Sequence, residues 1–255
     1  GVRQTHACRS GDRQDSFSGW YEGILDLREH FLALLQKRNG RIVIFGRRRL
    51  GFITLCLRIG RLVLKGIEIG MHRNCREQVR QMMEQYDFDQ VIGSIHYLED
   101  TDPFFGSYFE GKTWQQAYRC YLETLYTEMT AWGDFDIMGH YDYIVRYCDY
   151  DQVDLLYRHF SDVFDEIFRY LIHNGKALEI NTKSYQNFNG RQANLDKNIL
   201  LRYREMGGEI ISFGSDSHYL EHVGLEFEKY AAIVKSLGFK WAAHYENRKL
   251  IQLPL

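Results

Sequence analysis

Short apolar runs alternate with longer helical stretches from about residue 62 onward. Short apolar runs are typical of buried strands, whereas apolar positions repeated every three to four residues indicate helices. The expected strands are Leu62–Ile69, Gln90–His96, Phe135–Gly139, Ala177–Asn181, Glu209–Phe213 and Lys240–His244. The expected helices span about 73–86, 113–132, 151–174, 192–206 and 221–237. Strands and helices that alternate in this way predict βαβ units and a parallel sheet.

Several residues mark the ends of the expected helices. Thr113 and Gln116 have the spacing of a capping box, in which each side chain binds a backbone N–H of the other residue. Gly175 and Gly207 follow helical stretches where a left-handed C-cap is expected. No internal repeat or linker interrupts the pattern, so we expect a single domain over residues 1–255, with residues 1–61 atypical.

A parallel sheet either stays open or closes into a barrel. No Gly-x-Gly-x-x-Gly fingerprint of a dinucleotide-binding open sheet occurs in the sequence. Candidate reactive residues instead follow several different strands, as in barrel enzymes, whose catalytic groups come from the carboxyl ends of many strands. The sequence therefore favours an α/β barrel.

The formal net charge of −2 hides an uneven distribution. Residues 1–61 carry twelve basic and five acidic side chains, a charge of +7, and the rest of the chain carries −9. An acidic bulk argues against a nucleic-acid groove there, because phosphate backbones are bound by clustered Lys and Arg. It suits a protein that holds cations.

The sequence predicts neither a membrane span nor a signal peptide. No apolar run reaches the roughly 18 residues that a membrane span needs, and the first residues do not resemble a signal peptide. The cysteines are scattered without a Cys-x-x-Cys pair, which indicates reduced thiols. We therefore expect a cytoplasmic protein without a membrane partner. The cysteines are Cys8, Cys56, Cys75, Cys120 and Cys148.

Carboxylate and imidazole side chains stand at four expected strand ends: Glu68, His96, His140, and the pair Asp216 and His218. Each alone has an ordinary structural interpretation, such as a solvent-facing Glu or a hydrogen-bonded His. Together they favour a metal site, because burying such groups is costly unless they are paired or bind a metal. A mixture of His and carboxylates suits Zn²⁺, Mn²⁺ or Fe²⁺.

The sequence resembles the PHP (polymerase and histidinol phosphatase) family over roughly residues 62–255. The resemblance is carried by Gly66-Ile-Glu-Ile-Gly, Gly93-Ser-Ile-His-Tyr, Gly139-His-Tyr-Asp, Leu178-Glu-Ile-Asn and Gly214-Ser-Asp-Ser-His. The stretch Gly139-His-Tyr-Asp-Tyr-Ile-Val-Arg-Tyr is most similar to the histidinol-phosphatase branch. The resemblance implies a distorted (β/α)7 TIM-like barrel with up to three divalent metal ions. It also implies hydrolysis of a small phosphate monoester, with L-histidinol phosphate as the favoured substrate.

The resemblance also implies residue roles. Glu68 would bridge two metals, His96 and His140 would bind one of these, Asp216 the other, and His218 the third. Glu68, Asp216 and His218 would thus be the catalytic residues. For the substrate, Arg146 is a candidate phosphate contact and Asn181 a candidate at the pocket mouth. The alternative for Arg146 is a surface arginine, and the alternative for Asn181 is a strand-end or turn residue. For Tyr97 and Tyr141, core packing is favoured over lining the pocket.

The first sixty residues depart from the family pattern. The family opens with His-x-His and later carries Thr-Asp-His. Here His6 matches one member of the His-x-His pair, and the resemblance implies that it is a metal ligand, but Cys8 stands at the second position and no Thr-Asp-His occurs. His30 lies in a helical pattern and is interpreted as a surface residue. One hypothesis is a shifted reading frame or a sequencing error in this segment, and the other is genuine divergence into a basic arm. In the second, Arg47–Arg49 is either a phosphate contact or a solvated turn.

Two further functions remain as alternatives. With part of the family's ligand set replaced, the protein would be a catalytically impaired metal- or phosphate-binding relative. A phosphoesterase or nuclease with another substrate is the other alternative, which the acidic bulk disfavours. The sequence contains no signal for an oligomeric state.

Overall fold

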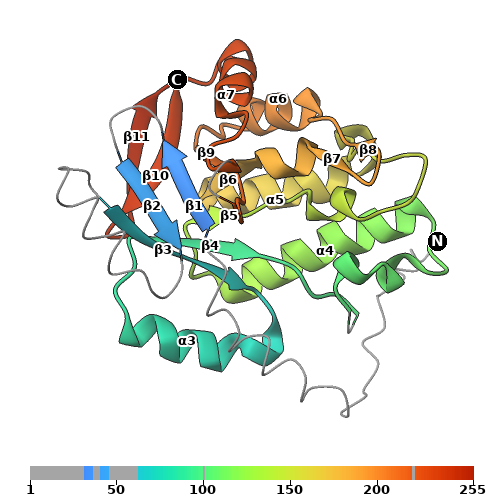
Figure 1. Cartoon of the computed structure of the whole chain (residues 1–255), viewed down its shortest axis with the longest axis horizontal. Helices are drawn as coiled ribbons and strands as arrows, with labels where there is room; N and C mark the ends of the chain where they lie inside the picture. The colour runs from blue at the N-terminus through green and yellow to red at the C-terminus, as the bar shows by residue number, and fades with distance from the viewer. Residues whose placement is uncertain (1–31, 37–40, 46–62, 100, 220–221) are drawn as a thin grey trace.

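The computed structural model describes residues 32–36, 41–45, 63–99, 101–219 and 222–255, and Figure 1 draws the other residues as a thin grey trace. The predictions for His6, Cys8, His30 and Arg47–Arg49 lie outside the described residues. A single domain over residues 1–255 therefore stays a prediction. Within the described ranges no helix is both long and apolar enough to cross a membrane.

Seven strands form the main sheet, in the order β1-β2-β3-β4-β5-β6-β9. They are β1 Leu32–Gln36, β2 Arg41–Phe45, β3 Val63–Gly70, β4 Gln90–Ser94, β5 Ile137–Met138, β6 Ala177–Asn181 and β9 Ile211–Gly214. β1 and β2 run antiparallel, and each later pair of neighbours runs parallel. The predicted α/β class is therefore confirmed. Among the described strands no pairing joins β9 back to β1 or β2, so closure into a (β/α)7 barrel stays a prediction.

Helices connect these strands and cover the sheet. They are α3 Arg76–Gln85, α4 Trp114–Trp132, α5 Ser161–His173, α6 Lys197–Glu205 and α7 Phe227–Ser236. Figure 1 shows α4, α5 and α6 side by side, in chain order. The predicted capping box is confirmed at the start of α4, where the Thr113 hydroxyl accepts the Gln116 N–H and the Gln116 carboxamide accepts the Thr113 N–H.

The two faces of the sheet bury different side chains. Val91, Met138 and Leu178 join the main core together with residues of the helices. On the opposite face, the strand register places Glu68, on β3, in line with Ile92 on the neighbouring strand β4. Apolar side chains near the amino ends of the strands form a second cluster on this face. Its buried members are Leu64, Ile92, Ile137, Ala177 and Tyr245.

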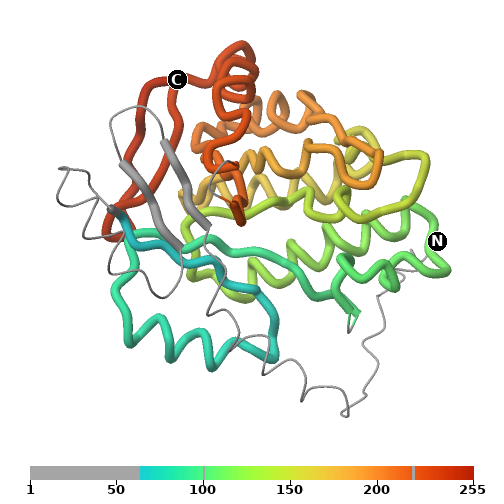
Figure 2. Tube along the Cα trace, viewed as in Figure 1, coloured from blue at the N-terminus to red at the C-terminus, as the bar shows by residue number. Residues whose placement is uncertain are grey.

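The last predicted strand forms but does not join the main sheet. It is β10 Trp241–Glu246, which pairs antiparallel with β11 Lys249–Pro254 through a turn at Asn247 and Arg248. Both turn residues have positive φ, 49° and 62°, as two-residue hairpin turns require. Figure 2 shows the turn of this C-terminal hairpin beside the segment that leads into β4, where the Arg248 N–H donates to the Asp89 carbonyl at 2.9 Å. There the Tyr245 N–H donates to the Gln90 carboxamide oxygen at 3.0 Å, beside the amino end of β4.

Three predicted helices are too long at their amino ends, and one hairpin was not predicted. The helix expected at 221–237 begins only at Phe227. The helix expected at 151–174 begins only at Ser161, because the backbone before it is bound by distant side chains: the Asp196 carboxylate accepts the Tyr157 N–H at 2.8 Å. The helix expected at 192–206 begins at Lys197, with Asp196 as its N-cap. The small hairpin of β7 Asn187–Phe188 and β8 Arg191–Gln192 turns at an Asn-Gly pair, a recognised hairpin signal.

Candidate metal and phosphate site

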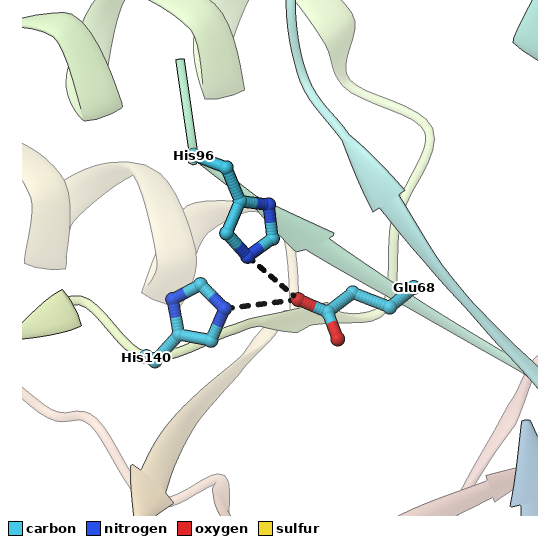
Figure 3. A group of neighbouring side chains, drawn as sticks. All are labelled: Glu68, His96 and His140. Atoms are coloured by element: carbon cyan, nitrogen blue, oxygen red, sulfur yellow. Dashed lines mark hydrogen bonds and ion pairs between the residues drawn. The ribbon is translucent and has the colours of Figure 1, made fainter. Parts of the chain in front are cut away.

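Glu68, His96 and His140 converge from three neighbouring strands (Figure 3). Glu68 lies within β3, and each histidine stands two residues beyond the end of its strand, β4 or β5. Oε1 of Glu68 is 2.9 Å from Nε2 of His140 and 3.4 Å from Nε2 of His96. The carboxyl ends of parallel strands meet at one edge of a sheet, and this brings together residues far apart in the sequence.

Burial and mutual charge determine the protonation of this group. Burial by itself would raise the pKa of Glu68, but the hydrogen bond and charge of His140 and the charge of His96 hold it well below its ordinary value. Burial would lower the pKa of His140, but the bond to Glu68 raises it. The pKa of His96 is lowered, first by burial and then by the charge of His140. The contact between Glu68 and His140 therefore favours an ionised carboxylate beside a protonated imidazole, and binding of a metal would require that imidazole to lose its proton.

The donor set fits a divalent metal. One ligand atom from each of Glu68, His96 and His140 lies within 4.8 Å of the other two. Two imidazole nitrogens and one carboxylate are the ligands of many catalytic zinc sites, which keep a further position open for water or substrate. His140 is almost completely buried, and its Nδ1 has no hydrogen-bond partner among the described residues. The group therefore has the chemistry and the spacing of a metal site.

A second charged group centres on Asp216, two residues beyond β9. Asp216 is buried with φ 44°, and this left-handed conformation provides the bend that lets Asp216 and His218 reach the same region. Arg146 Nη1 is 2.5 Å from Asp216 Oδ2, and Lys183 Nζ is 3.7 Å from the same oxygen. Lys183 Nζ also lies 3.0 Å from Nδ1 of His218. Burial would raise the pKa of Asp216, but Arg146 and Lys183 lower it below its ordinary value.

The two groups are close enough for the charge of one to shift the pKa values of the other. The charge of Asp216 favours the protonated forms of both His96 and His140. The structure thus brings the predicted site residues Glu68, His96, His140, Arg146, Asp216 and His218 together in two adjacent groups. Their roles as metal ligands stay predictions.

Arg146 is not the surface arginine of the alternative interpretation. Its side chain is 1% exposed, and its Nε donates to the Ser184 hydroxyl at 3.1 Å. Its Nη2 is buried without a hydrogen-bond partner among the described residues. A buried guanidinium with an unused donor is suited to an anion, because it binds phosphate oxygens through two parallel N–H groups.

Asn181 is buried at the end of β6, where its side chain has a structural task. Its Oδ1 accepts the Lys183 N–H at 3.2 Å, and its Nδ2 donates to Glu179 at 3.2 Å. These contacts match the turn-residue interpretation. Tyr141 is buried and packs edge-on against Phe164, as core packing predicts.

Two residues of the site were missed in the sequence. Glu179 interrupts an apolar strand just as Glu68 does, and this shared pattern was an available signal. Its Oε2 accepts the backbone N–H of His140 at 2.6 Å. Lys183 had no sequence signal, because its side chain reaches from the end of β6 to the loop after β9, which is 33 positions away.

A phosphate-loop spacing elsewhere does not form a phosphate loop. Gly106-Ser-Tyr-Phe-Glu-Gly-Lys-Thr113 matches the Gly-x-x-x-x-Gly-Lys-Thr pattern and precedes α4. Its lysine, Lys112, pairs with Glu99 at 2.8 Å and donates to the Tyr108 carbonyl at 2.6 Å. Its threonine hydroxyl caps the helix. The groups that would bind a phosphate are therefore already engaged.

Comparison with known proteins gives three kinds of likeness. The family model described as PHP domain matches residues 49–183. A probable histidinol-phosphatase of Clostridium acetobutylicum is 32% identical over 181 residues, which cover 70% of this chain and 69% of that protein. The histidinol-phosphatase of Lactococcus lactis is 28% identical over 186 residues, 72% of this chain and 68% of that protein.

A solved structure has the same fold. It is the histidinol phosphate phosphatase of Lactococcus lactis, complexed with zinc, L-histidinol and phosphate, at a TM-score of 0.70 and 25% identity. The match covers 78% of this chain and 76% of that one. These likenesses confirm both the resemblance seen in the sequence motifs and the prediction of a metal-dependent phosphatase.

Proposed function

The chain belongs to the PHP domain family, and on this premise we propose that it hydrolyses L-histidinol phosphate to L-histidinol and phosphate, a step of histidine biosynthesis. The observation that carries the proposal is the adjacency of two groups. Glu68, His96 and His140 form a metal-type cluster, and Arg146 beside Asp216 keeps an unused buried donor. Hydrolysis of a phosphate ester needs both groups, because cations neutralise the charge of the phosphoryl group and an anion-binding side chain orients it.

The proposed metals are Zn²⁺, Mn²⁺ or Fe²⁺, up to three per chain. Glu68 would bridge two ions, His96 and His140 would bind one of them, Asp216 the other, and His218 the third. His6, outside the described residues, would complete the first group. When bound, such ions acidify water and neutralise the oxygens of a phosphoryl group. The zinc in the Lactococcus lactis structure supports this choice.

The side chains around Asp216 would orient the phosphoryl group. Arg146 and Lys183 approach the Asp216 carboxylate from different elements, and both would bind phosphoryl oxygens. Burial lowers the pKa of Lys183, and the carboxylate of Asp216 opposes that effect. In the reaction, water attacks phosphorus, the bond from phosphorus to the ester oxygen breaks, and the leaving alcohol takes up a proton. Asn181 would keep the turn that carries Lys183 in place.

A row of aromatic rings offers a surface for the organic part of the ester. The ring centroids of Tyr143 and His96 are 4.9 Å apart, and those of Tyr147 and Tyr143 are 5.0 Å apart. The ring centroid of Phe104 is 5.4 Å from that of Tyr147, and Phe104 is 60% exposed. The row therefore leads from the metal-type cluster to the protein surface. Planar rings pack well against such surfaces, and the imidazole of L-histidinol phosphate is planar.

Two structural predictions belong to the same proposal. A distorted (β/α)7 barrel is supported by the match to the Lactococcus lactis structure over most of both chains. A cytoplasmic location is supported by the scattered cysteines of the sequence, which include no Cys-x-x-Cys pair.

The test is phosphate release by the full chain with Zn²⁺ or Mn²⁺ present. L-histidinol phosphate would be compared with other small phosphate monoesters at equal concentrations. The proposal expects the highest kcat/KM with L-histidinol phosphate. Faster hydrolysis of the other esters would overturn the substrate, while no hydrolysis together with one bound ion or none would indicate a catalytically impaired relative.

A further inference from the structure

Glu179 is a buried carboxylate beside the metal-type cluster. Its position in the middle of β6, two residues beyond Ala177, places its side chain on the sheet face that carries Glu68. Only 2% of the residue is exposed. Burial, and to a smaller extent the charge of Glu68, raise the pKa of Glu179 to about 7, against the opposing charge and backbone N–H of His140. A carboxylate in this place is unfavourable by itself, so its contacts need an explanation.

The Glu179 carboxylate holds the backbone of a predicted metal ligand. Its Oε2 accepts the N–H of His140 at 2.6 Å and the Asn181 side-chain amide at 3.2 Å. The carbonyl oxygen of His140 accepts the hydroxyl of Tyr121 at 3.0 Å. The backbone of His140 is therefore held at both its N–H and its carbonyl, which constrains the direction in which the imidazole leaves the backbone.

Two glycines leave room for this arrangement. A Cβ on Gly214, on the neighbouring strand β9, would collide with the Glu179 carboxylate. A Cβ on Gly139, directly before His140, would collide with the side chains of Ser94 and Ile92. The turn that carries His140 thus lies pressed against β4 on one side and held by Glu179 on the other.

We propose that Glu179 is a positioning residue for the metal site: it fixes the backbone of His140 so that Nε2 points at the carboxylate of Glu68 and at a shared cation. The inference rests on the proposed function, because it assumes that His140 binds a metal. Residues that orient metal ligands typically change metal affinity by about 10- to 100-fold when they are removed. The effect acts through His140, since Glu179 already uses Oε2 for backbone and amide donors.

The chain contains a matched control in Asp136. This carboxylate is also buried, and its Oδ2 accepts a backbone N–H, that of Val91, at 2.7 Å. It lies just before β5, at the amino end of the sheet, and it also binds Arg248. Asp136→Ala therefore removes the same kind of bond in the same sheet, away from the metal-type cluster.

The experiment titrates the metal-stripped full chain with Co²⁺, whose visible absorption depends on its ligands. We expect Glu179→Ala to weaken Co²⁺ binding by about 10- to 100-fold and to alter the absorption bands. Glu179→Gln should restore binding close to that of the parent, because its amide oxygen accepts the same two N–H groups. Asp136→Ala should lower the melting temperature but leave the Co²⁺ affinity and spectrum unchanged.

Parent-like Co²⁺ binding by Glu179→Ala would overturn the proposal, and so would an equal loss in Asp136→Ala. If Glu179→Ala does not fold, Glu179→Asp takes its place, because its shorter side chain keeps the charge but does not reach the His140 N–H. Parent-like binding by Glu179→Asp would then refute the positioning role. A parent protein that binds Co²⁺ but does not hydrolyse L-histidinol phosphate would refute the proposed substrate and leave this inference standing.

Discussion

The Glu68 carboxylate and the His140 imidazole meet at 2.9 Å although they are 72 positions apart in the sequence. Each residue is carried by a short parallel strand, and the two strands flank β4 in the sheet. The carboxylate stays ionised because the imidazole beside it lowers its pKa. This pair is the centre of the predicted metal site, and its removal gives the most direct test of that site.

Replacing His140 by Ala should remove one metal ligand and leave Glu68 buried without its main partner. We expect zinc affinity to fall by at least about tenfold, with a parallel loss of phosphatase activity. Elemental analysis of the purified protein and phosphate release would measure the two effects. His173→Ala, at the exposed end of α5, is the control and should keep parental metal content. Unchanged zinc content in His140→Ala would exclude His140 as a ligand.

Lys183→Met should weaken phosphate binding while keeping the length of the side chain. The ammonium faces Asp216 and His218, and a charge-assisted hydrogen bond to phosphate is worth about 1.5–3 kcal/mol. We therefore expect the inhibition constant of inorganic phosphate and the KM to rise roughly tenfold or more. The exposed Lys240→Met serves as the control for loss of a positive charge. An unchanged inhibition constant would assign Lys183 a structural role only.

Phe104→Ala tests the aromatic row as the surface for the leaving group. The ring is exposed and packs edge-on against Tyr147 and Phe105, so its loss should not disturb the core. We expect the KM for L-histidinol phosphate to rise by about 2- to 10-fold, as for one lost aromatic contact. The KM for an aliphatic ester such as glycerol phosphate should not change. Equal changes for both esters would show that the row does not select the substrate.

The pair of Asp165 and Arg202 predicts a pH-dependent part of the stability. Arg202 binds both oxygens of Asp165, at 3.0 and 2.8 Å, and these hydrogen bonds lower the pKa of Asp165. A carboxylate whose folded pKa is lowered stabilises the fold above its unfolded pKa of about 3.9, and this stabilisation is lost as the pH falls through the folded pKa. Asp165→Asn should therefore be less stable than the parent at pH 7, and the difference should shrink below about pH 4.

Urea denaturation of both proteins between pH 7 and pH 3 measures this difference. The exposed Asp149→Asn, for which no basic partner is seen among the described residues, is the control. A stability difference for Asp165→Asn that stays constant across this range would show that the ion pair does not account for it.

Local patterns in the sequence determined most of the elements. The apolar run Ala177–Asn181 predicted β6 with its exact bounds, and the Thr113 capping box predicted the start of α4. Such signals suffice because strand burial and helix caps depend on residues close in the sequence. The same approach failed at 151–160, where the side chains of Asp196 and others bind the backbone from far along the chain. It also did not reveal that β10 pairs with β11 outside the main sheet.

The sequence by itself also determined which residues were candidates for chemistry, since Glu68, His96, His140 and Asp216 stand at strand ends. Only the tertiary structure decided what each one contacts. It placed Lys183 against Asp216, and it placed Glu179 beneath the backbone of His140. Contacts of this kind depend on strand order and register, because a parallel sheet joins strands through long crossovers and brings their ends together independently of sequence distance.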